Sequence, residues 1–347
     1  MNPVSARLLG QQLICPEFTT PAEVVAWLGA MQAQDYRMMR WAVGMRCKKP
    51  SLKAFTKDFD TGRIVRTHLL RTTWQLVPGE DLGWMLDLCR DSALRGLRGW
   101  MKTNGVSIPQ KEQAQVQEVF ADVLSLKRSA RKEDFAAALA QRDMGMDDHR
   151  LSYHIRLAEF GGLLCSGELH PTKATYSLTE VKLPPQRTLT REEALAELAR
   201  RYFRSHGPAT LEDFVWWSGL GILDCRQAIE ALGSELVREH HLRLNFYFHQ
   251  DARIRGFRNG CVHLLPPYDE YLIGYKSRHV SLHPDHRHQA HNQRGIFWPV
   301  LLLDGQVVGN WSFSNGVVRT EIFHPNADPD PEALAREVAR HERFLKR

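Results

Sequence analysis

The feature that most constrains this 347-residue chain is a repeated order of predicted elements. The N-terminal ends of three predicted helices share one pattern. Each helix begins at Thr, Ser or Pro-Ala-Thr and has acidic residues in its first turn. Apolar residues then follow at helical spacing. Each start follows another helical segment and precedes a third helix and two short β-prone strands. The three starts lie at residues 19–28, 129–139 and 208–217.

The second copy shows the order most completely. A helix over 111–126 precedes it, and a helix over 147–160 leads into strands at 163–167 and 174–178. Helix, helix, helix, hairpin is the order of a winged-helix unit, in which the third helix can enter a DNA groove and the hairpin forms the wing. Some winged helices bind proteins instead of DNA. The order of elements alone therefore does not decide between a DNA partner and a protein partner.

The other two copies are read in the same way. In the third copy, a helix over 191–205 comes first, 223–232 is the third helix and 235–248 is the wing; in the first copy, 62–77 supplies the hairpin. Residues 181–185, which end in two prolines, indicate a linker between copies two and three.

Beyond residue 250 the pattern changes to strands. Strands are predicted at 261–265, 296–303, 306–313 and 317–323, with Asp304-Gly305 and Asn315-Gly316 as hairpin turns and a helix over 331–346. We therefore predict an α+β protein with three tandem winged-helix domains followed by a small C-terminal antiparallel β-barrel. The predicted domains are 1–105, 106–183, 186–250 and 251–347.

Positive charge is concentrated in one part of the chain. Residues 37–102 hold 14 Lys and Arg against 6 Asp and Glu, an excess of eight, whereas the whole chain has a net charge of +6. Binding to a polyanion would explain this distribution, because each neutralised phosphate releases condensed counterions. A solvated basic surface is the alternative.

Several classes of protein are disfavoured by what the sequence lacks. No apolar run approaches the roughly 18 residues of a membrane span, and the N-terminus lacks the apolar stretch of a signal peptide. The six cysteines include no Cys-x-x-Cys pair, which favours reduced thiols in a cytoplasmic protein without membrane association. Phosphate-loop, dinucleotide, zinc-protease and zinc-deaminase motifs are also absent.

A histidine cluster is the one group of candidate metal ligands. His283, His286, His288 and His291 could bind zinc. The surrounding Pro, Asp, Arg and Gln residues favour a solvent-exposed loop instead, and we predict neither a metal nor any other cofactor.

Gln32-Ala33-Gln34, which we place at the end of an apolar helix, resembles the Gln-apolar-Gln signature of the AlkZ-type DNA glycosylases, relatives of the YcaQ group. Similar segments follow in the family's order over nearly the whole chain. They are the arginine-rich strand pair at 66–77, the third winged-helix opening at 206–219, the Pro-aromatic-Asp segment at 265–275 and the strands at 295–297 and 304–311.

The resemblance implies a monofunctional DNA glycosylase that acts on double-stranded DNA carrying N7-alkylated purines, and some members of the family unhook interstrand crosslinks. Carried over by position, Gln32 and Gln34 are the catalytic pair. Such an enzyme would be associated with the bacterial nucleoid when bound to DNA. Lacking leucine-rich heptads, the chain is expected to be a monomer.

Further residues are assigned to DNA contact or to support of the site. The candidates for DNA binding are Arg37, Arg66, Arg71, Trp74 and Gln75, and the candidates for supporting the site are Tyr268 and Asp269. Structural ion pairs are the alternative for Arg66 and Arg71, a core position is the alternative for Trp74, and a turn-stabilising role is the alternative for Tyr268 and Asp269.

Two glutamines suit this chemistry. Alkylation at N7 makes the purine a cationic, good leaving group, so the reaction needs no general acid. A glutamine carbonyl can accept a hydrogen bond from the attacking water, and its dipole can face the positive charge that develops on the sugar. An amide is too weak a base to activate water against an undamaged, neutral base.

The sequence departs from the family pattern at Gln75. Many members carry histidine there, in a Thr-x-His-apolar-Val pattern, whereas this chain has Thr73-Trp74-Gln75-Leu76-Val77. The alternative function is therefore a non-enzymatic winged-helix DNA-binding protein or regulator that has kept the fold without the chemistry.

Overall fold

The protein is described by a computed structural model that covers residues 2–241, 243–253, 255–323 and 327–346. It has a mixed α/β fold in two compact units, the first combining Met1–Phe55 with Leu195–Arg347 and the second comprising Thr56–Ala194. The boundary falls inside helix α4 (Leu52–Asp60). Residues 1–105 therefore contribute to both units, and the division into four domains stays a prediction.

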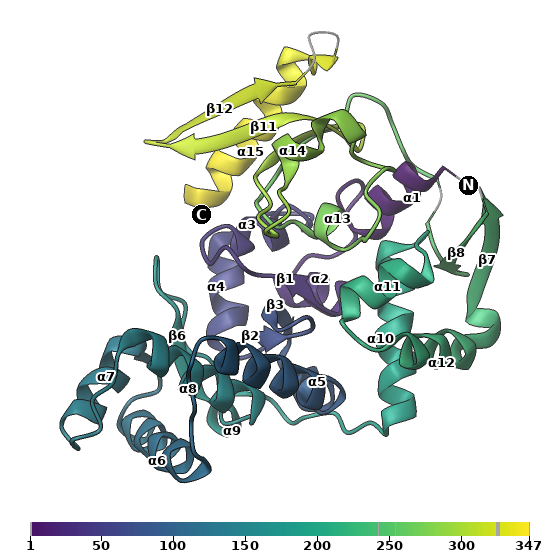
Figure 1. The fold of residues 1–347 in the computed structure, drawn as a ribbon. Coiled ribbons are helices and arrows are strands. Elements are labelled where there is room, and N and C mark those ends of the chain that lie inside the picture. The colour runs from purple at the N-terminus through teal and green to yellow at the C-terminus, as the bar shows by residue number, and fades with distance from the viewer. Residues whose placement is uncertain (1, 242, 254, 324–326, 347) are drawn as a thin grey trace. The chain divides into compact units, whose positions relative to one another are not determined.

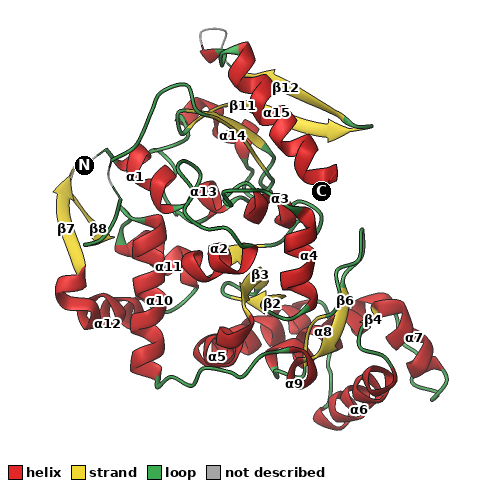
Figure 2. Cartoon of the chain, turned by 180° about the vertical axis from the view of Figure 1, so that it is seen from behind, coloured by secondary structure: helices red, strands yellow, loops and turns green. Residues whose placement is uncertain are grey.

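The second unit is mainly helical around small antiparallel sheets (Figure 2). Phe120, Phe135 and Ile155, one from each of three helices, meet in its core. The helices predicted at 111–126, 129–139 and 147–160 and both strands after them are confirmed. In chain order, these elements are α6 (Gln110–Leu126), β4 (Ala130–Arg131), α7 (Lys132–Ala140), α8 (Asp148–Phe160), β5 (Leu164–Ser166), β6 (Thr175–Leu178) and α9 (Thr179–Lys182). The helix α9 occupies the start of the predicted linker.

A hairpin and a long helix precede these elements. Strands β2 (Ile64–Leu69) and β3 (Thr73–Pro78) pair antiparallel, which confirms the hairpin predicted at 62–77. The turn between them places Leu70, Arg71 and Thr72 at φ of 28°, 44° and 58°, a left-handed conformation that non-glycine residues seldom adopt. Helix α5 (Leu82–Thr103) follows, and the sequence analysis did not predict it.

The first unit begins with helices α1 (Pro3–Gly10) and α2 (Pro21–Leu28). The Thr20 side chain and Glu23 form a capping box that starts α2, and Gly29 at φ 80° ends it. Strand β1 (Met31–Gln32) comes next, so the placement of the two glutamines at a helix end is wrong. Helix α3 (Met39–Gly44) follows.

The unit continues after residue 195 with the predicted helices and wing. The elements are α10 (Arg191–His206), α11 (Leu211–Ser218), α12 (Ile222–Leu232), β7 (Leu236–His241) and β8 (Leu244–His249). Strands β7 and β8 pair antiparallel, which confirms the hairpin predicted at 235–248, apart from Leu242, which lies outside the described residues.

The C-terminal strands form an open sheet. Its order is β12-β11-β10-β9, and helix α15 (Pro331–Lys346) lies against it (Figure 1). Within the described residues this sheet has two edges, so the predicted closure into a barrel is not found. The strands are β9 (Val262–Leu265), β10 (Val300–Leu303), β11 (Gln306–Ser314) and β12 (Val317–Ile322).

The turns of this sheet agree with the prediction, and one strand is shorter than predicted. Asp304-Gly305 has φ of 52° and 80°, and Asn315-Gly316 has 52° and 78°, as a tight hairpin turn requires. Strand β10 begins only at Val300, after Pro299, which has no N–H to donate to a neighbouring strand. No described helix is long and apolar enough to cross a membrane, and all six cysteines are free thiols.

Candidate active site

The segment with the two glutamines lies directly after α2 in the first unit. Gln32 is 5% exposed, and its backbone N–H donates a 2.5 Å hydrogen bond to Glu270 Oε1. Gln34, two residues further on, is exposed. One glutamine is therefore enclosed and held through its backbone, while the other faces solvent.

Glu270, the first residue of α13 (Glu270–Ile273), is a buried carboxylate surrounded by hydrogen-bond donors. It is 1% exposed. Besides Gln32, its carboxylate accepts a hydrogen bond from Trp217 Nε1 at 3.1 Å and lies 3.2 Å from His206 Nε2. These contacts join β1, α10, α11 and α13 at one carboxylate.

His206 extends this network. Burial lowers the pKa of His206, although Glu270 acts in the opposite direction. A neutral imidazole with its proton on Nε2 donates to Glu270, and Nδ1 lies 2.8 Å from the Ser205 hydroxyl, which itself donates to the Arg201 carbonyl at 2.6 Å. The ring also stacks on Tyr202, with centroids 4.8 Å apart.

Asp269 forms a buried ion pair next to Glu270. Its two carboxylate oxygens accept from both terminal nitrogens of Arg46 at 2.7 and 2.9 Å, and both side chains are almost completely buried. Arg46 also donates to the carbonyl of Ala42 and to Gln11 Oε1. Asp269 caps α13 by accepting from the Tyr271 N–H, so the pair fixes the helix on which Glu270 stands.

Tyr268 and Asp35 flank the glutamine segment. Tyr268 adopts a left-handed φ of 60° and is half-buried. Partial burial and the nearby Asp35 carboxylate raise the pKa of Tyr268. Asp35 Oδ1 accepts from the Arg37 and Met38 N–H groups at 2.9 and 2.8 Å, which holds the turn after Gln34.

The predicted DNA contacts of the hairpin lie in the second unit. Arg66 is only 4% exposed, and its guanidinium lies 3.7 Å from the centroid of the Trp74 ring. The His68 ring packs on the same indole at 3.7 Å, and His68 Nδ1 lies 2.6 Å from the buried Glu159 carboxylate on α8. Trp74 therefore contacts the side chains of both Arg66 and His68.

The other three residues predicted to contact DNA differ in the solvent exposure of their side chains. Gln75 is buried on the other face of the hairpin, opposite Thr67, and its amide donates to Thr73 Oγ1 at 2.8 Å. Arg71 lies in the turn and is half-buried, and Arg37 is exposed. The DNA-binding roles of all five residues stay predictions.

Lys182 is the lysine with the most perturbed environment. Burial lowers the pKa of Lys182 to about 8, and its ammonium donates to the carbonyls of Ser166 and Gly167 at 2.6 and 2.7 Å. It borders a cavity of about 50 Å³. That volume is roughly that of one or two water molecules, too small for a nucleotide sugar.

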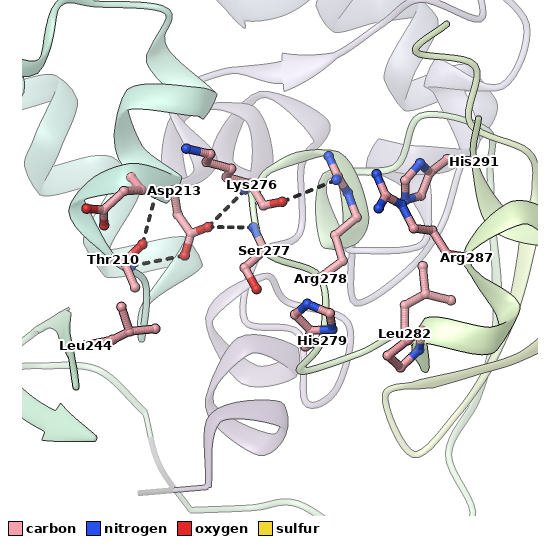
Figure 3. A pocket seen from close by; sticks show the side chains of 12 residues that line it. Thr210, Asp213, Leu244, Lys276, Ser277, Arg278, His279, Leu282, Arg287 and His291 are labelled. Carbon is pink, nitrogen blue, oxygen red and sulfur yellow. Dashed lines mark hydrogen bonds between the residues drawn. The ribbon is translucent and has the colours of Figure 1, made fainter. Parts of the chain in front are cut away.

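A larger pocket, of about 360 Å³, lies elsewhere in the first unit (Figure 3). Asp213 accepts from the N–H groups of Lys276 and Ser277 at 2.9 and 3.1 Å and so fixes one wall. The pocket includes neither glutamine of the predicted pair. Its ionisable lining residues are Glu212, Asp213, Lys276, Arg278, His279, Arg287 and His291.

The histidine cluster contributes one residue, His291, to the lining of this pocket. His286 and His288 lie in two short helical turns, η3 (Pro284–His286) and α14 (Arg287–Ala290), which His283 and His291 flank, so the segment is only partly the predicted loop. His283 and His288 are exposed, whereas His291 is buried and stacks on Phe297. Among the described residues, no three His, Cys, Asp or Glu side chains are placed to hold a metal ion.

Comparison with known proteins places this arrangement in a family. The family described as "DNA glycosylase AlkZ-like" matches residues 25–344. A protein of Streptomyces sahachiroi named "Interstrand DNA cross-link repair glycosylase" is 25% identical over 331 residues, which cover 90% of this chain and 86% of that protein.

The solved structure of the Streptomyces sahachiroi DNA glycosylase AlkZ has the same fold. It aligns with a TM-score of 0.78 and 21% identity, over 98% of this chain and 96% of that chain. The chain therefore belongs to the AlkZ-like family of DNA glycosylases.

Sequence reasoning missed the buried groups around the glutamines. Glu270 and His206 both lie in segments that resemble the family, yet neither differs in sequence from an ordinary charged surface residue. His68 and Glu159 are 91 residues apart, and nothing in their spacing indicates contact. Only the adjacency of Glu270 to Asp269 could have drawn attention to that carboxylate.

Proposed function

We propose that this protein is a monofunctional DNA glycosylase that hydrolyses the N-glycosidic bond of N7-alkylated purines, with Gln32 and Gln34 positioning the attacking water. The observation that carries the proposal is the contrast within the glutamine segment. Glu270 holds the Gln32 backbone from a buried network, while Gln34 is exposed to solvent. A fixed polar segment at a surface is suited to orient water against a bound nucleotide.

In this mechanism the glutamine carbonyls replace the general acid or general base that other hydrolases use. The leaving purine already carries the positive charge of alkylation and departs without protonation. The carbonyl oxygens accept hydrogen bonds from water near C1′, and their dipoles stabilise positive charge developing on the sugar. Glu270 is a positioning residue in this scheme, because its carboxylate is enclosed and already receives N–H donors from Gln32 and Trp217.

Hydrolysis without a lyase step is supported by the surroundings of Lys182. A lyase needs an amine that can reach C1′ of the sugar. The Lys182 amine is buried, bound to two carbonyl oxygens and next to a cavity of only about 50 Å³. We therefore propose that the product is an intact strand with an abasic site.

The finer architecture is part of the proposal. The order α6, β4, α7, α8, β5, β6, with the sheet order β4-β6-β5, supports a winged helix in the second unit. The order α10, α11, α12, β7, β8 supports another, and the isolated bridge between Ala209 and Tyr247 occupies the place of its first strand. We propose a further winged helix over 1–105 and action as a monomer on double-stranded DNA.

Interstrand crosslinks are proposed as a second substrate. The Streptomyces relative is named a cross-link repair glycosylase. A crosslinked base remains tied to the opposite strand and cannot enter a closed pocket, and the exposure of Gln34 supports an open site.

The test is a substrate panel for the wild-type protein. Duplex DNA that contains N7-methylguanine, a nitrogen-mustard crosslink or no damage is incubated with the protein, and released bases, unhooked strands and strand breaks are measured separately. We expect release from the two damaged duplexes only, no break before alkaline treatment and no borohydride-trapped complex. DNA binding without release from either lesion would favour the non-enzymatic DNA-binding alternative.

A further inference from the structure

The C-terminal half of α5 carries three cations and no acid. Residues 93–105 include Arg95, Arg98 and Lys102, all exposed, and no Asp or Glu. At 100° per residue their spacing of three and four places the three side chains on one face of the helix. No ion pair joins them to a carboxylate in the part of the chain that the structure describes.

In the preceding turns of the same helix, the basic side chain is paired with an acidic one. Arg90 forms an ion pair with Asp87 at 2.8 Å and also donates to the Phe160 carbonyl at 3.0 Å, so its charge is used within the unit. Asp91 is exposed one turn before Arg95 and makes no ion pair with it. Among the described residues of α5, the positive charge without an ion pair is thus confined to the last three turns.

Two glycines lie on the exposed surface of these turns. Gly99 lies along the axis between Arg98 and Lys102, about 40° around the helix from Arg95 and so at the edge of the cationic face, whereas Gly96 lies about 100° from Arg95. Glycine inside a helix is destabilising relative to alanine. The fold does not require either one, because a Cβ on Gly99 would have no atom within 4 Å and a Cβ on Gly96 would meet only the Thr72 side chain at 3.9 Å.

A cationic helix face that lacks a side chain along one edge, at Gly99, admits the close approach of a polyanion. Arg95 to Lys102 spans seven residues, or about 10 Å along the helix at 1.5 Å per residue. One strand of B-DNA carries a phosphate per roughly 3.4 Å of axis, so this length corresponds to about three phosphates. The turn at Leu70–Thr72 lies beside Gly96, where an added Cβ would be 3.9 Å from the Thr72 side chain, and so lies to one side of the three cations.

We infer that this face of α5, defined by Arg95, Arg98, Gly99 and Lys102, binds the sugar-phosphate backbone of duplex DNA, with Gly99 allowing the backbone to approach the helix. The inference rests on the proposed function for its partner but concerns a surface distinct from the glutamine segment. The competing explanation is that Arg98 and Lys102 only stabilise the negative C-terminal end of the helix dipole.

The first test is the salt dependence of binding to an undamaged fluorescent duplex. The variant Arg95→Ala/Arg98→Ala/Lys102→Ala is compared with Lys57→Ala/Lys111→Ala/Arg128→Ala, which removes three cations from other exposed positions of the unit. Each lost phosphate contact lowers the slope of log K against log salt by about 0.9, so the α5 variant should lose roughly 2 to 3 from that slope. Equal slopes for the two variants would overturn the inference.

The second test uses Gly99→Ala, which separates the two explanations. Alanine fits the helix and should raise the Tm slightly, because it favours helix formation. If a DNA backbone packs over Gly99, the same methyl group should weaken duplex binding several-fold despite the higher Tm. A raised Tm with unchanged binding would show that this face does not contact DNA closely.

The proposed glycosylase activity and the proposed DNA-binding surface on α5 can be refuted independently of each other. Wild-type protein that releases no damaged base but shows the α5-dependent salt slope would refute the glycosylase chemistry and leave the DNA surface in place. Base release by the wild type together with an unaltered slope in the α5 variant would refute the surface alone.

Discussion

The Glu270 carboxylate should couple the stability of the first unit to the position of Gln32, and Glu270→Gln tests this coupling. The substitution keeps size and shape but replaces one acceptor oxygen by an NH₂ donor. His206 can change tautomer to accept from that group. The Gln32 and Trp217 N–H groups cannot, and they contact different carboxylate oxygens, so one of them must face a donor.

The expected cost follows from this geometry. Leaving one buried donor without an acceptor costs about 1–3 kcal/mol, and the hydrogen bonds that remain lose their charged acceptor. We expect Glu270→Gln to reduce the free energy of unfolding by about 2–3 kcal/mol in urea titration. Displacement of Gln32 should slow single-turnover base release by about 10-fold or more, since a 10-fold change corresponds to about 1.4 kcal/mol.

A matched control shows whether the effect on base release depends on where the buried glutamate lies. Glu337 is another buried glutamate of the first unit, on α15, where it pairs with Arg340 at 3.2 Å. Glu337→Gln should leave the rate of base release at the wild-type value. Wild-type stability and wild-type release in Glu270→Gln would refute the assigned role of this carboxylate.

Two further predictions concern buried charge and buried histidine. Asp269→Asn leaves the Arg46 guanidinium enclosed without its anion and should destabilise the protein by about 3–5 kcal/mol in urea titration; a loss below 1 kcal/mol would contradict the ion pair. His341 is packed among Trp41, Trp311 and Phe313 with both ring nitrogens unpartnered in the described structure, so His341→Phe should stabilise by about 1–3 kcal/mol. Burial lowers the pKa of His341 to about 4, so between about pH 6.5 and pH 4 the unfolded chain binds a proton at this residue that the folded protein does not, and the free energy of unfolding falls as the pH falls through this interval. The variant's stability should depend less on pH over this interval, and an unchanged slope would contradict the assignment.

Local patterns predicted the elements well because each rests on short-range chemistry. The Asp304-Gly305 and Asn315-Gly316 turns, for example, need only residues that tolerate positive φ. Closure of the C-terminal sheet depends instead on pairing between distant strands, and the sequence contains no comparable signal for it. Helix α5 escaped prediction although it is 22 residues long.

The candidate site was predictable only in part. The glutamine segment was found through its resemblance to a family, and its conformation was predicted incorrectly because the helix signal of α2 was extended past Gly29. The residues that hold it come from segments more than 170 positions away: Glu270 is 238 residues from Gln32. Buried polar contacts of this kind depend on the tertiary fold, and no periodicity reveals them.

The most direct test of the account is the rate at which N7-methylguanine leaves methylated duplex DNA under single-turnover conditions, measured for the wild type, Gln32→Ala and Gln34→Ala. We predict release by the wild type and a fall in rate of 100-fold or more in each variant that still folds and binds DNA, which corresponds to about 2.7 kcal/mol in the activation barrier. Release at the wild-type rate by both variants would contradict the assignment of the glutamine pair as the groups that position water.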